Sequence, residues 1–299
     1  MLGFEICRPT SMRRALLYII GIAFIMGCTE TKKSDSKSIY VSILPLKGIV
    51  EQIVGEDYPI HVLVPAGASP ESFEPTARQL IELSDADIVM GVGALDFEKS
   101  MLERLGEERE IVNLSKGIEF IAGSCSHSHC NHEHHAHGID PHIWTSPREL
   151  KTIARNAFNA IERLHPDSTH YRVNFDSLIT RIEECDSSIM AQLSLNSVKS
   201  FYIYHPAMSY YARAYNIEQV AIEHEGKEPS VRRIGELISR GREEGIRNIF
   251  YQSQFPASSV EIIAKDLNGN AISFNPLEED IIAEIKRFTN LLCEHNSNQ

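Results

Sequence analysis

The chain has 299 residues, and its 41 Asp and Glu against 29 Lys and Arg give a formal net charge of -12 at pH 7. This acidic balance argues against a nucleic-acid partner, because nucleic acids are bound by basic surfaces. An acidic surface does attract cations, but at physiological salt its field is screened over about 8 Å and does not select one metal from another. Any metal selectivity must therefore come from a defined site.

The N-terminal segment has the pattern of a secretion signal. Two arginines precede an apolar run over residues 15–26, which is too short for a stable membrane span, and Gly27 and Cys28 follow it. This ending resembles a bacterial lipobox, in which the cysteine sulfur receives a diacylglyceryl group before cleavage. We therefore expect residues 1–27 to be a signal peptide and 28–38 to be a flexible tether. Lipidated Cys28 would anchor the protein to a membrane in the periplasm or another extracytoplasmic space, and a signal peptide without lipidation is the alternative.

Four cysteines lie beyond the anchor, in what would be an oxidising compartment where disulfides form. Cys125 and Cys130 flank histidines, so they either pair with each other or bind metal. Cys185 and Cys293 are expected to be ordinary buried thiols.

The length of the remaining chain predicts two domains, since roughly 260 residues exceed the usual single core. In the first part, β-rich runs at 39–44, 60–64, 88–92 and 111–114 alternate with helical stretches at 48–54, 76–83 and 97–105. The second part repeats the alternation, with strands at 201–204, 219–222, 248–251 and 271–274 and a helix at 231–244. Such alternation predicts parallel sheets covered by helices, and hence two α/β lobes.

Two helices are predicted between these parts. Ser146, Pro147 and Glu149 form a helix start, with a serine cap, proline at the first helical position and a glutamate able to return a hydrogen bond to the cap. The next helix, over 168–195, has no Gly or Pro, and its apolar residues recur every three or four positions: Tyr171, Phe175, Leu178, Ile182, Cys185, Ile189 and Leu193. It would reach about 40 Å and join the lobes as a stiff spine. The predicted organisation is thus an N-terminal lobe over 39–167, this linking helix, and a C-terminal lobe over 196–299.

A histidine-rich stretch is the strongest signal in the composition. Six of the thirteen histidines fall within thirteen residues of a predicted loop over 124–138, namely His127, His129, His132, His134, His135 and His137. Neutral imidazoles bind metals, although a solvated loop without a role is the alternative. A flexible loop must lose chain entropy to wrap an ion, so we expect it to be an accessory metal collector.

A rigid site is expected where strand ends from both lobes face one cleft, because open α/β sheets bind ligands beyond the carboxyl ends of their strands. Three segments qualify: V-P-A-G-A-S-P-E-S-F-E-P over 64–75, D-P-H-I-W-T-S-P over 140–147, and F-Y-I-Y-H-P over 201–206. With E-P-S over 228–230 and Gln254-Phe255, these motifs resemble, in order, those of the zinc- and manganese-binding solute-binding lipoproteins of bacterial ABC importers. The resemblance runs from about residue 39 to the C-terminus, and it implies two parallel-sheet lobes with metal in the cleft between them.

The resemblance also implies ligands. His142 and His205 match the family's second and third ligands, and Glu71 stands where the family usually has a histidine. Asn275, in an Asn-Pro-Leu turn, stands where an aspartate is common. Two nitrogens and one anionic oxygen suit zinc, with the fourth tetrahedral place filled by Asn275, water or a loop histidine. His224 is a reserve donor. Four other histidines are expected to be structural: His61, His165, His170 and His295.

The implied function is the capture of Zn²⁺ as a transported ligand and its delivery to the permease and ATPase of an ABC importer, by a monomer that is not an enzyme. Manganese would favour more oxygen donors, whereas nitrogen donors favour zinc. The alternatives are a manganese-specific protein or metal-dependent adhesin of the same fold, and a storage protein whose histidine loop is the whole function. A secreted zinc hydrolase is a further alternative, but neither H-E-x-x-H nor G-x-S-x-G occurs in the sequence.

Overall fold

The structure is a computed structural model, which describes residues 38–105, 111–122, 138–224 and 226–294. The predicted signal peptide, Cys28 and the tether up to residue 37 lie outside the described residues. The six loop histidines, Cys125, Cys130 and His295 also lie outside them. Within the described ranges, none of the helices combines the length and apolar character needed to cross a membrane.

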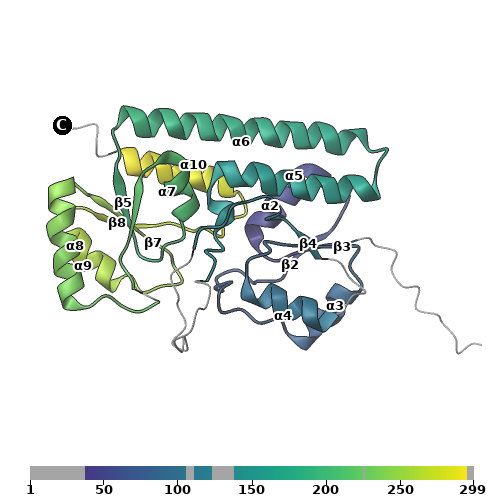
Figure 1. Cartoon of the computed structure of the whole chain (residues 1–299), viewed down its shortest axis with the longest axis horizontal. Coiled ribbons are helices and arrows are strands. Elements are labelled where there is room, and N and C mark those ends of the chain that lie inside the picture. Colours follow the sequence, from purple (N-terminus) through teal and green to yellow (C-terminus); the bar gives the residue numbers. More distant parts are fainter. Residues whose placement is uncertain (1–37, 106–110, 123–137, 225, 295–299) are drawn as a thin grey trace, which may run out of the picture. The chain divides into compact units, whose positions relative to one another are not determined.

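The described strands form two parallel sheets of four strands each (Figure 1). The first sheet has the order β2-β1-β3-β4 and consists of Ile39–Val41 (β1), Ile60–Val62 (β2), Ile88–Gly91 (β3) and Ile111–Asn113 (β4). The second repeats this order as β6-β5-β7-β8, with Ser200–Ile203 (β5), Glu218–Ala221 (β6), Asn248–Tyr251 (β7) and Asn270–Ser273 (β8). In each sheet the order reverses beside the first strand, where ligands of such folds bind. The predicted fold class is confirmed.

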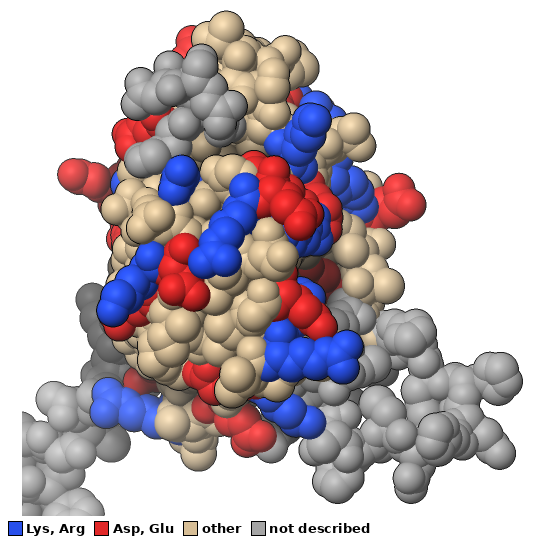
Figure 2. Space-filling view, turned by 90° about the vertical axis from the view of Figure 1, so that its left-hand side faces the viewer, with Lys and Arg blue, Asp and Glu red and all other residues tan. Residues whose placement is uncertain are grey.

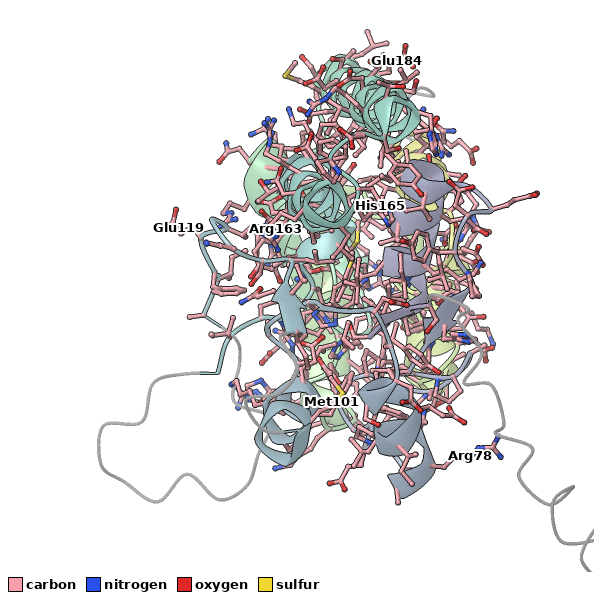
Figure 3. The ribbon with its side chains drawn as sticks, turned by 90° about the vertical axis from the view of Figure 1, so that its right-hand side faces the viewer. Arg78, Met101, Glu119, Arg163, His165 and Glu184 are labelled. Atoms are coloured by element: carbon pink, nitrogen blue, oxygen red, sulfur yellow. The ribbon has the colours of Figure 1, made fainter. Side chains whose placement is uncertain are left out.

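Helices connect the strands and cover both faces of the sheets. The first lobe contains α2 (Leu44–Val54), α3 (Ala77–Ser84) and α4 (Asp96–Leu105), and the second contains α7 (Ser209–Tyr215), α8 (Val231–Glu244), α9 (Ser258–Asp266) and α10 (Ile281–Cys293). An end-on view shows α3 and α4 on the opposite side of the first sheet from α5 (Pro147–Leu164) and α6 (Thr169–Leu195) (Figure 3). Met101 of α4 points into the protein and is buried.

Helix α6 is the predicted spine, and it runs along both lobes (Figure 1). Its buried residues are the seven of the predicted apolar stripe, from Tyr171 to Leu193. It packs against α5 and α2 on the side of the first lobe and against α10 on the side of the second. Cys185, on this stripe, and Cys293, on α10, are buried free thiols as expected. The lobes are therefore joined by a continuous helix, while the exact lobe boundaries stay a prediction.

The start of α5 differs from the prediction. Pro147 does occupy the first helical turn, but the side chain of Ser146 makes no capping hydrogen bond. Glu149 instead accepts a hydrogen bond of 2.8 Å from Arg213 on α7. The predicted capping hydrogen bonds are therefore wrong: among the described residues, the Ser146 hydroxyl and Oε2 of Glu149 are buried without a hydrogen-bond partner, while Oε1 of Glu149 pairs with Arg213.

The segment over 275–280, which follows β8, packs directly against α2 of the first lobe. A β-carbon on Gly48 would lie 2.0 Å from the carbonyl oxygen of Glu279, so only glycine allows this close approach of the two backbones. Lys47 also forms an ion pair with the Glu279 side chain. This end of the second lobe is thus held against the first.

Two further contacts hold the same segment. The indole N–H of Trp144 donates to the carbonyl oxygen of Pro276 at 2.7 Å, and Arg181 of α6 forms an ion pair with Asp280. Trp144 is fully buried within the larger of two hydrophobic clusters, which contains residues of both sheets. The lobes therefore share one core at this interface.

The charged side chains of the surface are mixed in sign. On the face of the second lobe seen in Figure 2, Lys and Arg are interspersed with Asp and Glu. Arg240 of α8, for example, forms ion pairs with Glu218 and Glu244. Exposed pairs of this kind stabilise a protein by only about 0–1 kcal/mol each, so they do not hold the fold together.

Candidate metal centre

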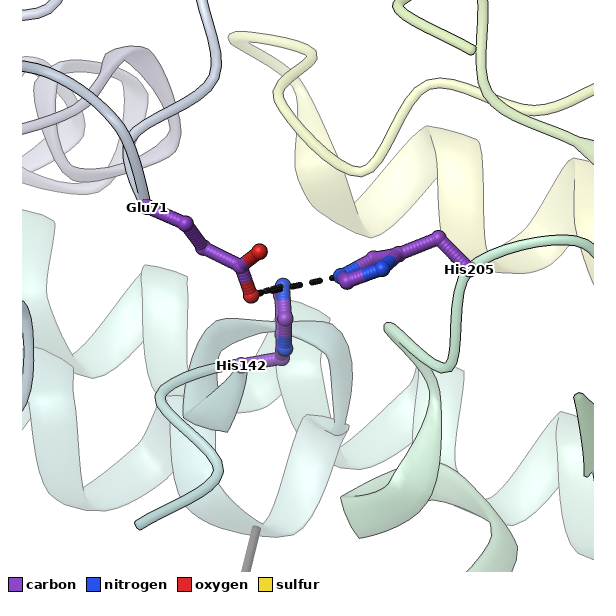
Figure 4. Close-up of side chains that lie close together, drawn as sticks. All are labelled: Glu71, His142 and His205. Carbon is purple, nitrogen blue, oxygen red and sulfur yellow. Dashed lines mark ion pairs between the residues drawn. The ribbon is translucent and has the colours of Figure 1, made fainter. Parts of the chain in front are cut away.

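Three side chains from distant parts of the chain meet where the two lobes face each other (Figure 4). Glu71 lies between β2 and α3, His142 directly precedes a 3-10 helix over Ile143–Thr145, and His205 follows the central strand β5. Oε1 of Glu71 lies 3.6 Å from Nε2 of His142 and 3.3 Å from Nε2 of His205. Among the described residues, these form the cluster of potential ligand atoms that lie within 4.8 Å of one another.

The separations of Glu71 from the two imidazoles fit one tetrahedral ion. With metal–ligand bonds of about 2.0–2.2 Å, two ligands of tetrahedral zinc lie roughly 3.3–3.5 Å apart, close to the separations of Glu71 from the two imidazoles. The side chains of His142 and His205 are 7% and 13% exposed, whereas Glu71 is 35% exposed. The two imidazoles therefore lie in the interior, and the more exposed Glu71 side chain directs its carboxylate at them (Figure 4).

A buried carboxylate holds each imidazole in place. Nδ1 of His142 lies 2.9 Å from Oδ1 of Asp140, and Nδ1 of His205 lies 2.8 Å from Oε1 of Glu223. Asp140 and Glu223 are both buried. Since a carboxylate accepts the Nδ1 proton, each imidazole in its neutral form presents the Nε2 lone pair to the cluster, which is the arrangement of metal-bound histidines.

Sequence reasoning did not assign roles to these two carboxylates. Asp140 could have been found from the D-P-H motif, because a carboxylate two residues before a ligand can reach its ring. Glu223 directly precedes the reserve donor His224 and was not predicted to take part in the site. It follows β6, the strand next to β5, so its position at the carboxyl end of an adjacent strand was the available signal.

Aromatic rings and an amide fix the ligands further. The ring of Phe255 stacks on His205 with a centroid separation of 4.9 Å, and Trp144 lies 5.2 Å from His142. The side-chain amide of Gln252 accepts from the backbone N–H of His205 at 3.2 Å and donates to its carbonyl oxygen at 2.8 Å. The site is therefore preorganised rather than assembled from mobile side chains.

Burial and hydrogen bonds together determine which groups of the site are charged. Burial would lower the pKa of His205, but its hydrogen bonds with Glu223 and Glu71 outweigh burial and raise this pKa to about 9. Burial raises the pKa of the Glu71 carboxyl, but the hydrogen bond from His205 and the charges on both histidines lower it overall. Burial also raises the pKa of the Asp140 carboxyl, but the hydrogen bonds from His142 and Ser209, together with the charge on His142, lower this pKa overall. The site thus favours ionised carboxylates that attract a cation.

A small cavity of about 30 Å³ adjoins the three donors, which is room for one or two water-sized species. Besides the donors, its walls are largely apolar: Ser69, Pro70, Trp144, Gln252, Gln254, Phe255, Pro276 and Leu277. This volume suits a single ion with a small fourth ligand and excludes an organic molecule of ordinary size.

The hydrogen bonds of the Asn275 side chain stay within its own turn. Its Oδ1 accepts from the backbone N–H of Leu277 at 3.1 Å, and its Nδ2 donates to Glu278 at 2.7 Å. Its backbone N–H donates to the buried carboxylate of Glu284. The side-chain amide is used inside its own turn, so the structure gives no support to Asn275 as the fourth ligand.

The remaining histidines of the described chain lie apart from the cluster. His224 is exposed, and its backbone N–H donates to the carbonyl of Lys227. The three described histidines expected to be structural each have a partner: His61 stacks on Tyr40, His165 is hydrogen-bonded to Tyr58, and His170 is hydrogen-bonded to Asp57.

This fold places the chain among the two-lobe α/β solute-binding proteins of metal transport. Residues 39–295 match the family described as zinc-uptake complex component A, periplasmic, or ZnuA, and the chain belongs to this family.

Curated relatives and solved structures show the same likeness. The chain is 25% identical over 284 residues to the zinc-binding protein AdcA of Streptococcus pyogenes serotype M3, an alignment that covers 88% of this chain and 55% of AdcA. The chain therefore spans about half the length of the first curated relatives it matches. It is 26% identical to the high-affinity zinc uptake system protein ZnuA of Bacillus subtilis, with 88% of each chain covered.

Among solved structures, a crystal structure of ZnuA superposes with a TM-score of 0.77 at 29% identity and covers 88% of this chain and 100% of its own. A ZnuA variant lacking residues 138–173 of its own sequence, with zinc bound, has a TM-score of 0.76 and 29% identity, and covers 89% of this chain and 100% of its own.

Proposed function

We propose that this protein captures zinc outside the cytoplasmic membrane and delivers it to the permease and ATPase of an ABC importer. The main support is that ligand atoms of Glu71, His142 and His205 lie within 4.8 Å of one another, with a buried carboxylate hydrogen-bonded to each imidazole. Two nitrogens and one oxygen suit zinc, and nitrogen donors disfavour manganese relative to zinc. The relatives named for zinc binding and zinc uptake support the same cargo.

In this proposal Glu71, His142 and His205 are the three protein ligands. The fourth tetrahedral place is taken by water or by a histidine of the loop over 124–138, rather than by Asn275. The loop histidines collect ions of lower affinity, because a flexible loop must be ordered by each ion it binds. Zinc is the transported cargo, and the protein supplies no catalytic step.

Lipidated Cys28 would hold the mature protein at the membrane, near the permease. A curated relative of Streptococcus pneumoniae is named a zinc-binding lipoprotein, which supports this expectation. The substitution Cys28→Ala should abolish labelling of the expressed protein by a radioactive fatty acid. Undiminished labelling of that variant would show that the anchor lies elsewhere.

Zinc titration with a competing chelator tests the central proposal. Wild-type protein should bind one ion tightly, and at free zinc one thousand times the dissociation constant the ion should add about 4 kcal/mol to the free energy of unfolding. His142→Ala and His205→Ala should each remove the tight ion and most of this stabilisation. His61→Ala is the matched control, because His61 is exposed and lies apart from the cluster. The cleft site is wrong if both cleft variants retain wild-type affinity.

The same titration discriminates the alternatives. A storage protein would bind several weak ions and lose all binding when the loop over 124–138 is removed. A manganese-specific protein would bind manganese tightly when no zinc is present, whereas a site with two nitrogen donors should bind it weakly. A capture protein keeps one tight zinc ion when the loop is removed.

A further inference from the structure

Tyr210 of α7 connects the second lobe to the metal centre without touching a ligand. Its side chain is fully buried, and its hydroxyl donates to the backbone carbonyl oxygen of Asp140 at 2.7 Å. The same hydroxyl accepts from the backbone N–H of Ile121 at 3.2 Å. One hydroxyl of the second lobe therefore holds two backbone segments of the first.

These two segments are also joined to each other. The backbone N–H of Asp140 donates to the carbonyl oxygen of Ile121 at 2.9 Å, and Ala122 and Ile139 form an antiparallel bridge. Asp140, Ile121 and Tyr210 thus close a ring of three hydrogen bonds. The backbone of Asp140 is held through both its N–H and its carbonyl oxygen.

Asp140 in turn holds His142 by two contacts. Its Oδ1 accepts from the backbone N–H of His142 at 2.9 Å, and the same atom lies 2.9 Å from Nδ1 of the ring. Because a shift of the Asp140 backbone carries its carboxylate along, the direction of the His142 Nε2 lone pair depends on where that backbone is fixed.

Arg213 of the same helix holds the ring of Tyr210 in place. The guanidinium of Arg213 lies over the ring, 4.9 Å from its centroid, and donates to the carbonyl oxygen of Glu119 and to the carboxylate of Glu149. Arg213 thereby ties α7 to two further segments of the first lobe. The hydroxyl of Tyr210 is in this way kept at a defined position between the lobes.

We propose that Tyr210 is a positioning residue of the metal centre, which acts from the second lobe through Asp140 to orient His142. The inference rests on the proposed zinc site. Outer hydrogen-bond partners of metal-bound histidines change metal affinity by about 10–100-fold, and Tyr210 stands one step further out. Loss of its hydroxyl should therefore weaken zinc binding by about tenfold, at the lower end of that range.

Tyr211 provides a matched control. It neighbours Tyr210, is likewise fully buried, and has its hydroxyl 2.8 Å from Oγ1 of Thr289 in the core of the second lobe. Tyr210→Phe and Tyr211→Phe each remove one buried hydroxyl, so both are expected to lower stability, Tyr210→Phe by more because its hydroxyl makes two hydrogen bonds and that of Tyr211 makes one. Only the first should change the metal centre.

The experiment is a double-mutant cycle on the dissociation constant of the tight zinc ion, measured in the full mature chain by chelator competition. Tyr210→Phe should weaken binding about tenfold, and Tyr211→Phe should leave it unchanged. Asp140→Ala should weaken it more, and adding Tyr210→Phe to Asp140→Ala should have no further effect, because the path through Asp140 is already lost. The visible absorption of cobalt bound in place of zinc gives a second readout, which should change in Tyr210→Phe and not in Tyr211→Phe.

Two outcomes would overturn the inference: zinc affinity of Tyr210→Phe equal to that of Tyr211→Phe, or a full tenfold loss that persists in the Asp140→Ala background. Failure of the proposed function is distinguishable, since the wild-type chain would then bind no tight zinc ion at all. Should Tyr210→Phe fail to fold, Arg213→Met, which frees the ring of Tyr210, should weaken zinc binding in the same direction. Unchanged affinity in Arg213→Met would then count against the inference.

Discussion

Glu71 of the first lobe and His205 of the second approach each other with Oε1 and Nε2 3.3 Å apart. Their side chains come from loops at the carboxyl ends of two different sheets, so an ion between them binds both lobes at once. In the absence of an ion, a proton shared by this pair would take the same place. Proton and zinc therefore compete for one position.

The first prediction concerns this competition. The pKa of His205 is raised to about 9, above its ordinary 6.5, so the proton on His205 stabilises the metal-free fold fully below pH 6.5, and this contribution is lost as the pH rises through 9. Zinc needs the neutral imidazole, so zinc affinity should rise with pH up to about 9 and then level off. Calorimetry at pH 7.5 in buffers of different ionisation enthalpy should show about one proton released by His205 for each zinc ion. Proton release that stays the same at pH 9.5 would contradict this assignment.

The second prediction concerns Glu71. Glu71→Ala should weaken zinc binding by removing the anionic ligand, and Glu71→Gln should weaken it less, because an amide oxygen can still coordinate without charge. Glu71→His should retain or strengthen zinc binding, since it adds a third imidazole nitrogen, a donor that zinc accepts readily. Glu74, three residues further along, is the control, and Glu74→Ala should leave the dissociation constant unchanged. Equal affinities in Glu71→Ala and wild type would remove Glu71 from the site.

The third prediction concerns Asn275. Because its amide bonds within its own turn, Asn275→Ala should lower stability by about 1 kcal/mol through loss of the bond to the Leu277 N–H, while zinc affinity stays within about twofold. Asn275→Asp would place a carboxylate beside Glu278 and Glu284, and should destabilise the metal-free protein more. A large loss of zinc affinity in Asn275→Ala, measured by chelator competition, would instead identify it as a ligand.

The fourth prediction concerns Gly48. A methyl group there would meet the backbone of Glu279, so Gly48→Ala should force the lobes apart locally and lower the free energy of unfolding by about 1–3 kcal/mol. Gly235→Ala on α8 is the control, because a β-carbon at that position meets nothing within 4 Å. Removal of a helical glycine should there raise stability by about 0.5–1 kcal/mol. Denaturant unfolding of both variants measures these changes. Equal changes in the free energy of unfolding would show that the close contact between Gly48 and the Glu279 backbone does not affect stability.

Local periodicity predicted most of the fold. The stripe from Tyr171 to Leu193 has the spacing of a helix with one buried face, and α6 buries those residues. The strands were found within a few residues because parallel strands are nearly continuous apolar runs. The start of α5 was predicted less well, since the sequence around Ser146 shows neither the burial of the Ser146 hydroxyl without a partner nor the ion pair of Glu149 with Arg213, far along the chain.

The candidate site could be predicted only in part. His142 and His205 stand in specific motifs, and the structure brings them together with Glu71. Glu223 was missed because charge and loop position also describe a solvated residue, and only the pairing of β6 with β5 turns it toward His205. Asn275 was proposed as a ligand because its Asn-Pro-Leu turn resembles a turn of the family. That resemblance could not show which groups the side-chain amide would bond.

The packing of the segment over 275–280 on α2 has a consequence for how the protein unfolds. Along the chain this segment belongs to the second lobe, yet its contacts with Gly48 and Trp144 complete the surface of the first. The larger buried cluster likewise contains residues of both sheets, such as Val89 and Phe201. Loss of either lobe would expose apolar surface on the other, so the lobes depend on each other thermodynamically. Residues 38–294 are therefore expected to unfold in one cooperative transition, and a fragment that ends after α6 should not reach a native state.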